Sequence, residues 1–439
     1  MIWVYRVLFL PLLLLASPYY LWRMRRRGGY AENFAQRFGG TNPLPPRTDG
    51  TRRVWLQAVS VGEMLAIAPL LEAFQREGHT EVYLTTTTST GCQLAKEKYG
   101  ALTIGLGYFP LDFWAFSARA WQRVGPDLCI LMEGERWPEH VHQARKRRVP
   151  VICVNARLSD RSFRRSLKFR ALLRPLAEGI TQVLCSSKRD EQRFKALGVK
   201  PERLQTTGNL KLDVQIPRLA DGAKAQLRRE LGLGGGLVLL GSSTWVGEEV
   251  ALLTALKSAR ERGLQVSLLL VPRHAERREE LRGLLDKSGL TFHLRSEGHC
   301  FAKATKGGAA PAAVDVAVGD TTGELRKFTQ LADLVFVGKS LAPHEGGQTP
   351  VEAAVLGKPV VHGPRMTNFR EIIRTLTEAG AVRRVETHSE LITTVVELLQ
   401  DPVQRNKLAV AAQAWHEENR GATERTLTVI HEQLAALSL

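Results

Sequence analysis

The sequence predicts an α/β protein with two doubly wound domains behind an apolar N-terminal helix. Three observations support this prediction: a length of 439 residues, too long for one ordinary core; short apolar runs that alternate with longer amphipathic stretches; and a lapse of that alternation at 212–236. Such alternation is typical of parallel sheets covered by helices on both faces. We therefore expect domains at 28–215 and 237–439, with 216–236 as the linker between them.

The short apolar runs give the expected strands. In the first domain they are Val54–Val59, Glu81–Thr86, Leu128–Met132, Val151–Val154 and Val183–Cys185. In the second they are Leu237–Leu240, Val266–Val271, Leu334–Val337 and Pro359–His362. Helices are expected at 64–75, 91–99 and 247–262, with a long amphipathic helical stretch at 403–437 that is able to pack back on the first domain, and a surface loop at 296–313.

Residues 1–27 are predicted to form a membrane anchor with a basic flank. Ile2–Trp22 is almost entirely apolar and is followed by Arg23–Arg27. About 20 apolar residues can span a bilayer, and a charge cluster behind the apolar run is typical of a retained anchor rather than a cleaved signal peptide. The positive-inside rule then places the rest of the chain at the cytoplasmic face. Pro11 and Pro18 leave a segment lying flat in the interface as the alternative.

The composition indicates a folded protein with an anionic partner. The chain has 61 Lys and Arg against 44 Asp and Glu, a formal net charge of +17. That balance favours nucleic acid, phospholipid head groups or a phosphorylated substrate, without choosing among them. None of the five cysteines forms a C-x-x-C pair, and the H-E-x-x-H, P-loop and Asp-x-Asp patterns are missing. We therefore expect no metal.

Two loops of the first domain place carboxylates directly after a predicted strand, where open α/β sheets bind ligands. Val59–Glu63 ends on Glu63, which either faces a cleft as a general base or only complements a helix dipole. Met132–Pro138 contains Glu133 and Glu135. These two either serve a site or form a helix N-terminal cluster with a local counter-charge.

Two further loops of the first domain supply positive charge. Asn155–Ser159 follows a predicted strand and leads into a basic stretch, which is either a solvated helix face or a surface for lipid phosphates: Arg161, Arg164, Arg165, Lys168 and Arg170. Gly208–Asp213 contains Lys211, which would point toward a cleft between the domains. A lone lysine is more often a surface residue.

The second domain has four loops suited to binding an anion. Gly241–Trp245, which includes Ser242, is a small-residue loop whose backbone N–H groups suit a phosphate. Arginine suits bidentate phosphate contact, and Arg273 follows Pro272 at a strand end. The other two loops each lead into a helix and contain Thr322, Gly323 and Glu324, and Thr349, Pro350, Val351 and Glu352. A tight turn that requires glycine is the alternative for each loop.

In this order, these stretches resemble the Kdo transferases, membrane-anchored bacterial GT-B enzymes that transfer 3-deoxy-D-manno-octulosonic acid (Kdo) from CMP-Kdo to lipid A precursor. The matching stretches cover nearly the whole chain: Val59–Glu63, Met132–Pro138, Asn155–Ser162, Gly208–Asp213, Gly241–Glu249, Val271–Arg277, Asp320–Leu325, Gly338–Glu352 and Gly357–Phe369. The resemblance implies two Rossmann-like domains that face a central cleft. The chain departs from the family pattern at Gln348 and Thr349, where the family commonly has His-Asn.

The resemblance also implies roles for individual residues. Glu63 would be the proton acceptor, and Glu133 or Glu135, with Lys211, would support the transition state. CMP would be held by Pro272 and Arg273, by Thr322, Gly323 and Glu324, and by Thr349, Pro350, Val351 and Glu352.

The implied activity is inverting transfer of Kdo to a hydroxyl of lipid IVA in lipopolysaccharide synthesis, at the cytoplasmic face of the inner membrane. Its partners would be CMP-Kdo, lipid A precursor and an anionic membrane surface, with no cofactor, metal or nucleic acid. Three alternatives stay open at this point. They are a transferase that uses a UDP-sugar on another membrane lipid, a nucleotide-sugar epimerase, and a non-enzymatic, membrane-tethered nucleic-acid binder.

Overall fold

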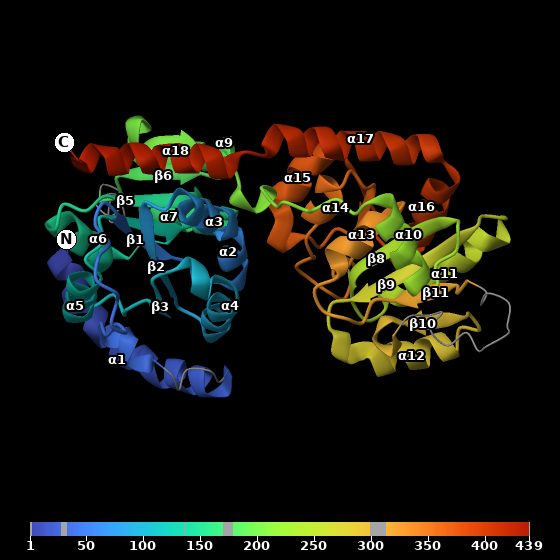
Figure 1. Cartoon of the computed structure of the whole chain (residues 1–439), viewed down its shortest axis with the longest axis horizontal. Helices are drawn as coiled ribbons and strands as arrows, with labels where there is room; N and C mark the ends of the chain where they lie inside the picture. The colour runs from blue at the N-terminus through green and yellow to red at the C-terminus, as the bar shows by residue number, and fades with distance from the viewer. Residues whose placement is uncertain (1, 28–32, 136, 170–178, 299–312, 439) are drawn as a thin grey trace. The chain divides into compact units, whose positions relative to one another are not determined.

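The computed structural model describes residues 2–27, 33–135, 137–169, 179–298 and 313–438. The chain forms two compact units: the first comprises Met1–Asp213 and Asn419–Leu439, and the second comprises Val214–Glu418 (Figure 1). Both are α/β units, as predicted. Residues 299–312, most of the expected surface loop, lie outside the described residues, as do Arg136 and Arg170.

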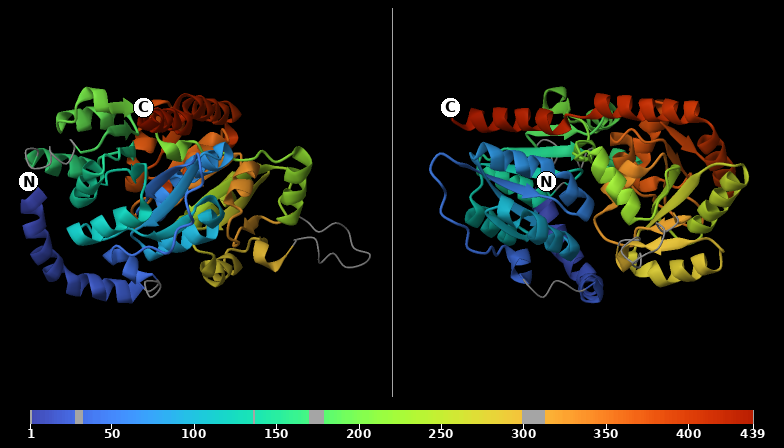
Figure 2. Two further views of the ribbon diagram at one scale, coloured as in Figure 1. Left: turned by 60° about the vertical axis from the view of Figure 1, so that its left-hand side comes forward. Right: turned by 45° about the vertical axis from the view of Figure 1, so that its right-hand side comes forward.

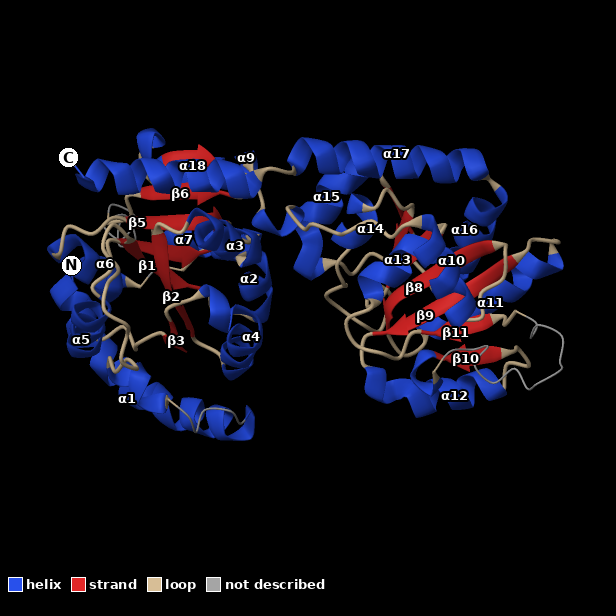
Figure 3. Cartoon of the chain, in the orientation of Figure 1, coloured by secondary structure: helices blue, strands red, loops and turns tan. Residues whose placement is uncertain are grey.

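The first unit is built on a seven-stranded parallel sheet with the order β3-β2-β1-β4-β5-β6-β7. The strands, red in Figure 3, are β1 (Arg52–Gln57), β2 (Thr80–Thr86), β3 (Gly105–Tyr108), β4 (Leu128–Met132), β5 (Val151–Ala156), β6 (Gln182–Cys185) and β7 (Leu204–Thr206). Its helices are α1 (Ile2–Arg27), α2 (Val61–Ala66), α3 (Ala68–Glu77), α4 (Ser89–Tyr99), α5 (Trp114–Val124), α6 (Pro138–Lys146), α7 (Asp160–Lys168), α9 (Lys188–Ala196) and α18 (Ala422–Ala435).

Both faces of this sheet are covered, because successive side chains of a strand point to opposite faces. On β1, Val54 and Leu56 belong to one buried cluster, which also contains Ile430 of α18. Trp55, between them, belongs to a second cluster that includes Trp121 of α5. The C-terminal helix therefore supplies part of the core of the first unit.

The second unit repeats the design with the strand order β10-β11-β9-β8-β12-β13-β14, again all parallel. Its strands are β8 (Leu237–Thr244), β9 (Val266–Pro272), β10 (Phe292–Leu294), β11 (Val316–Val318), β12 (Leu334–Val337), β13 (Val360–His362) and β14 (Val382–Arg384). Its helices are α10 (Asp221–Glu230), α11 (Glu248–Glu261), α12 (Arg278–Asp286), α13 (Leu325–Leu331), α14 (Val351–Val355), α15 (Arg370–Glu378), α16 (His388–Gln400) and α17 (Pro402–Asn419).

Residues 216–236, which we expected to be a linker, belong to the second unit instead. They contain α10, whose Leu227 is buried, and Leu231 and Leu233 behind it are buried as well. The Leu219 N–H also donates to the side-chain oxygen of Gln330 at 2.8 Å. The polar sequence of α10 concealed this role, because only a few apolar side chains attach the helix to the domain.

The strands that the sequence did not predict are short or lie toward the sheet edges. They are β3, β7, β10, β11 and β14, of three or four residues each. Short runs give little alternation to detect. The expected C-terminal helical stretch is two helices, α17 and α18, because Gly421 with a φ of 84° separates them.

The N-terminal helix α1 is bent, as Figure 2 shows, and it contains Pro11 and Pro18. Within the described residues, no single helix is long and apolar enough to cross a bilayer. Ile2–Phe9 and Leu13–Tyr20 together have the length and composition for it, but they are bent by 48° relative to each other.

Candidate active site

Three carboxylates of the first unit follow the two strands at which its strand order reverses. Glu63 comes after β1, and Glu133 and Glu135 come after β4, the strand paired with β1 on the side away from β2. Open α/β sheets bind ligands outside the carboxyl ends of the strands at such a switch point. The strand order therefore brings together residues that lie 70 positions apart in the sequence.

Glu63 is held at the start of α2 by a reciprocal capping arrangement. The Ser60 hydroxyl accepts the Glu63 N–H at 3.3 Å and donates to Glu63 Oε1 at 2.9 Å. The Val59 N–H donates to Glu63 Oε2 at 2.8 Å. The carboxylate thus serves the helix end, as one reading of the sequence held. Each oxygen still has accepting capacity for a ligand.

Burial raises the pKa of Glu63 above its ordinary value, and the neighbouring Glu133 carboxylate raises it further. The hydrogen bonds from Val59 and Ser60 and the ammonium group of Lys211 oppose this rise. Only 7% of Glu63 is exposed. A carboxylate with a raised pKa is a stronger base at neutral pH than an exposed one, so this position suits proton transfer.

Glu133 is held by two cations. Its Oε1 lies 3.0 Å from Lys211 Nζ and 2.6 Å from a guanidinium nitrogen of Arg157. The Glu133 backbone has a φ of 58°, in the left-handed region that a residue with a side chain rarely adopts. Two cations thus share one oxygen of this carboxylate, and Glu133 in turn orients Lys211.

Glu135 has a different environment. Burial and the carboxylates of Glu63 and Glu133 raise its pKa to about 7, whereas the side chain of Trp137 partly opposes the rise. Glu135 therefore changes its charge in the neutral pH range. Of the two carboxylates in this loop, Glu133 is the one paired with Lys211 and Arg157, and Glu135 is the one able to exchange a proton near neutral pH.

Lys211 is placed by contacts on both sides of its short 3-10 turn, Leu210–Leu212. The Asn155 side-chain oxygen accepts the Leu210 N–H at 3.2 Å, and Asn209 accepts the Lys211 N–H at 3.1 Å. The next residue, Asp213, accepts the N–H groups of Gly421 at 2.7 Å and Thr423 at the start of α18. The C-terminal helix therefore fixes the segment that carries Lys211.

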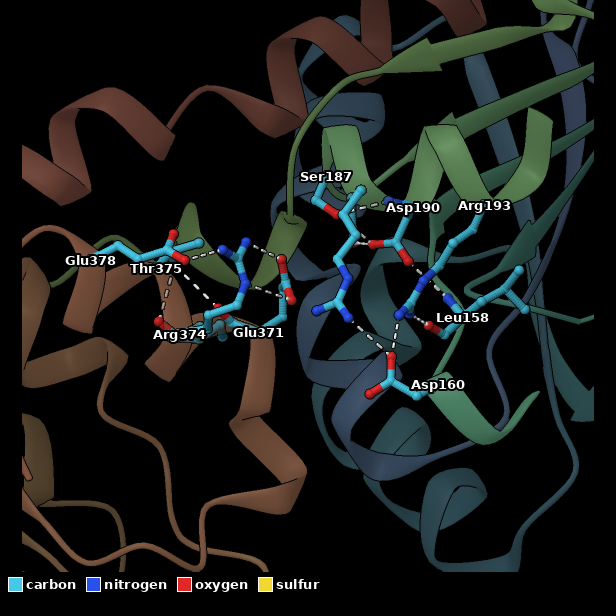
Figure 4. Close-up of polar contacts among 12 residues, drawn as sticks. Leu158, Asp160, Ser187, Asp190, Arg193, Glu371, Arg374, Thr375 and Glu378 are labelled. Atoms are coloured by element: carbon cyan, nitrogen blue, oxygen red, sulfur yellow. Dashed lines mark hydrogen bonds and ion pairs between the residues drawn. The ribbon is translucent and has the colours of Figure 1, made fainter. Parts of the chain in front are cut away.

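The chain directly after Arg157 is held by α9, through contacts of Leu158 and Asp160 that Figure 4 shows. Asp190 accepts the Leu158 N–H at 2.9 Å and the Ser187 hydroxyl at 2.6 Å. Arg193 donates to the Leu158 carbonyl and pairs with Asp160. These contacts pin the chain directly after Arg157, which directs its guanidinium to Glu133. The sequence prediction did not assign Arg157 to the catalytic group, although its place after a predicted strand could have signalled it.

The basic residues after this loop lie on one face of α7. Ser159 caps the helix by accepting the Ser162 N–H at 3.1 Å. Four exposed side chains recur at helical spacing: Arg161, Arg164, Arg165 and Lys168. Such a face suits phosphate groups.

In the second unit, two of the polar loops follow β8 and β12, the strands between which the strand order reverses, and the other two follow β9 and β11 on the β8 side. Ser242 lies near the end of β8 and is 5% exposed, and Pro272 is the last residue of β9. Arg273 is exposed, with its backbone N–H bonded to the Thr244 carbonyl at 3.2 Å. Its side chain is therefore available at the carboxyl edge of the sheet.

The loop after β8 is fastened to the loop after β12 by Glu248, a residue to which the sequence prediction gave no role. One oxygen of this fully buried carboxylate accepts the N–H groups of Trp245 at 3.0 Å and Lys339 at 2.9 Å. The other accepts those of Ser340 at 3.0 Å and Leu341 at 3.3 Å. The Lys339 ammonium lies 4.4 Å from the centroid of the Trp245 ring.

The remaining predicted nucleotide contacts lie in two turns of the same unit. Thr322 and Gly323 are exposed, whereas Glu324 pairs with Arg295 at 3.3 Å. The second turn leads into α14, which begins at Val351. Thr349 Oγ1 accepts the Val351 N–H at 3.2 Å, and Pro350 between them is buried.

Glu352 has one oxygen 3.7 Å from Arg326, and its other oxygen is buried without a hydrogen-bond partner. Such an oxygen is an acceptor that a ligand hydroxyl could satisfy.

Among the described residues, no group of three or more His, Cys, Asp or Glu side chains is arranged to hold a metal ion.

Solved structures place this architecture among known folds. HepE from Anabaena, solved in complex with UDP, is 16% identical and covers 88% of this chain and 100% of its own, with a TM-score of 0.56. The UDP-GlcNAc 2-epimerase from Neisseria meningitidis bound to UDP-GlcNAc is 14% identical with the same coverages and TM-score. At these identities the likeness concerns the fold, and the fold is that of GT-B glycosyltransferases, as predicted.

Sequence relatives identify the family. Residues 32–214 match the family described as 3-deoxy-D-manno-octulosonic-acid transferase (kdotransferase). The 3-deoxy-D-manno-octulosonic acid transferase of Bordetella pertussis is 34% identical over 96% of this chain and 97% of its own. That of Haemophilus influenzae is 32% identical over 97% and 95%. The chain belongs to the Kdo transferase family and is a glycosyltransferase.

Proposed function

We propose that this Kdo transferase takes Kdo from CMP-Kdo and adds it to a hydroxyl of lipid A precursor (lipid IVA), with inversion at the anomeric carbon. The observation that carries the proposal is the cluster at the carboxyl edge of the first sheet. There Glu63, with its raised pKa, lies beside Glu133, which Lys211 and Arg157 hold.

In the proposed reaction, Glu63 accepts the proton of the acceptor hydroxyl as its oxygen attacks the anomeric carbon of Kdo. The bond from that carbon to the CMP phosphate breaks, and the phosphate oxygen keeps the electron pair. Attack opposite the leaving group inverts the centre. Lys211 and Arg157 carry the positive charge that balances the carboxylates of this cluster, with Glu133 as their positioning residue.

The second unit is proposed to bind the nucleotide. Arg273 suits the single phosphate of CMP, with Ser242, Pro272, Thr322, Gly323 and the start of α14 near the same sheet edge. The unsatisfied oxygen of Glu352 suits a ribose hydroxyl. A leaving group with one phosphate needs less charge neutralisation than a diphosphate does, so we propose a reaction without a metal or other cofactor.

The acceptor is proposed to be met at the cytoplasmic face of the inner membrane. The basic face of α7 suits the phosphates of the lipid acceptor, and the apolar helix α1 suits the bilayer. The net charge of +17 is then explained by anionic lipid, so no nucleic-acid partner is proposed.

The test is incubation of the purified protein with CMP-Kdo and lipid IVA, followed by mass spectrometry of the lipid. Glu63→Gln should lower the rate by about 10²–10⁴ while CMP affinity, measured by calorimetry, is kept. The matched control is Glu97→Gln, an exposed carboxylate on α4, which should keep normal turnover.

Near-normal turnover in Glu63→Gln would exclude Glu63 as the base. Binding of UDP in place of CMP would instead favour a UDP-sugar donor, and loss of activity in EDTA would refute the metal-free reaction.

A further inference from the structure

The helix α1 has an exposed apolar face between Trp3 and Trp22. Nine large apolar side chains of α1 are each between 55% and 80% exposed: Trp3, Val4, Val7, Leu8, Leu14, Leu15, Tyr19, Tyr20 and Trp22. At about 100° per residue, all of them except Tyr20 fall within an arc of about 160°. The bend of 48° between Ile2–Phe9 and Leu13–Tyr20 divides this stripe into two halves. An exposed apolar stripe of this size indicates a partner that covers it.

The opposite face of α1 is bonded to the first unit. Arg6 forms a two-pronged ion pair with Glu139 of α6, with N–O distances of 2.8 and 2.9 Å. The Tyr5 hydroxyl donates to the Asp112 carboxylate at 2.7 Å. Phe9 stacks on Phe113 with 6.4 Å between the ring centroids. These residues lie on one side of the helix, away from the exposed stripe.

The carboxylates that receive α1 are part of the folded core. Glu139 is fully buried and Asp112 is 2% exposed. Asp112 also accepts the backbone N–H groups of Glu139 and His140, at 3.1 and 2.9 Å, at the start of α6. Because a buried carboxylate is costly without a cation or donor, Arg6 and Tyr5 stabilise the domain itself. The contact of α1 with the first unit is therefore part of that unit's folded structure.

The chain that follows α1 returns to the same unit. The Gln36 side-chain oxygen accepts the Tyr108 N–H at 2.8 Å, and Arg37 donates to the Phe109 carbonyl at 3.0 Å. A spanning helix would separate Arg6 from this region by the hydrocarbon core, which is about 30 Å thick. The N-terminal part of α1 and the chain that follows its C-terminal end are instead both fastened to one folded domain, which does not fit a helix that crosses the bilayer.

We propose that α1 lies in the plane of the membrane interface, with its exposed apolar face in an anionic phospholipid bilayer and its Tyr5–Arg6 face on the first unit. The inference rests on the proposed function only for the presence of a membrane. Trp3, Tyr19 and Trp22, near the two ends of the stripe, are residue types enriched at the level of lipid head groups. The basic sequence Arg23–Arg27 complements anionic lipid.

This arrangement links the membrane to the candidate active site. The docking residue Glu139 lies in the first turn of α6, directly after the loop that carries Glu133 and Glu135. Because Asp112 caps the same turn, α1 helps to hold that loop. The helix therefore acts as a fixed membrane-facing platform for the first unit.

The test compares the depth of three labels on the exposed stripe of the full chain. Leu8, Leu15 and Trp22 are replaced one at a time by cysteine and labelled with a fluorophore. The four described cysteines are buried, and Cys300, outside the described residues, is replaced by serine. Depth is measured with brominated lipids in vesicles of phosphatidylethanolamine and phosphatidylglycerol.

Equal, shallow depths at the three positions are expected. A steady progression of about 10 Å from one label to the next would show a spanning helix and overturn the inference. A middle label deeper than the other two would show a re-entrant hairpin and overturn it as well. Labels that all stay in water would refute both the inference and the proposed membrane location. Kdo transfer assayed in detergent would still test the proposed reaction.

A second measurement tests the docking contact. Spin labels at Val4→Cys and Glu97→Cys, both exposed and in the first unit, should give a narrow distance distribution. Arg6→Met should broaden it, because the helix loses its ion pair, whereas the matched control Arg76→Met on the exposed side of α3 should not. A broad distribution in the unsubstituted chain, or no change in Arg6→Met, would refute docking through Glu139.

Discussion

Glu135 is the carboxylate through which the candidate active site should make stability depend on pH. Burial and the carboxylates of Glu63 and Glu133 raise its pKa from 4.5 to about 7. Because the pKa is raised in the folded state, ionisation of Glu135 costs stability. That cost is absent below the unfolded pKa and grows as the pH rises, until it is complete above the folded pKa of about 7. Glu135→Gln removes the group that ionises and with it the cost.

The magnitude follows from the two pKa values. The difference between 4.5 and about 7 corresponds to about 3 kcal/mol. Since Glu135 is partly accessible to solvent, we reduce this to about 2 kcal/mol. Glu135→Gln should therefore be more stable than the unsubstituted protein by about 2 kcal/mol at pH 8 and by less than about 1 kcal/mol at pH 5.

The assay is urea unfolding of both proteins at pH 5, 6, 7 and 8, followed by tryptophan fluorescence. Glu97→Gln, an exposed carboxylate of the same unit, is the control and should show no such trend. A stability difference that stays the same from pH 5 to pH 8, or that reverses in sign at pH 8, would refute the assigned environment of Glu135.

Three further predictions concern single side chains. Lys211→Ala should lower kcat by at least about tenfold, since Glu133 loses one of its two cations; an unchanged kcat would remove Lys211 from the reaction. Arg273→Ala should raise the Kd for CMP at least about tenfold in calorimetry, and equal affinity would place the phosphate elsewhere. Glu248→Gln should destabilise the second unit by about 2–4 kcal/mol in urea unfolding, because the new NH₂ group faces two backbone N–H donors. A loss below about 1 kcal/mol would contradict that hydrogen-bond pattern.

The central strands of both sheets were predictable, because a strand that is buried on both faces consists of a continuous run of apolar residues. Strands β4 and β12 have the predicted bounds, since each is a continuous run of buried apolar residues. The polar helical stretch that forms α10 was interpreted as part of a linker, because its outer face is polar and a single buried residue, Leu227, lies within it. Short outer strands such as β7 and β14 are partly exposed, so their sequences contain no continuous apolar run that would predict a strand.

The sequence by itself determined the residue types, their order and their places after strands, and these indicated Glu63, Glu133 and Glu135 as candidates, whereas Lys211 was indicated only by the family resemblance. Tertiary structure decided how they differ from one another. Glu133 and Glu135 are two residues apart in the sequence. Glu133 forms ion pairs with Arg157 and Lys211, whereas Glu135 has a pKa of about 7. The physical reason is that charge and burial depend on neighbours from distant strands and helices. Arg157 reaches Glu133 only because α9 pins the chain after it, and α1 meets Glu139 across more than 130 positions of sequence.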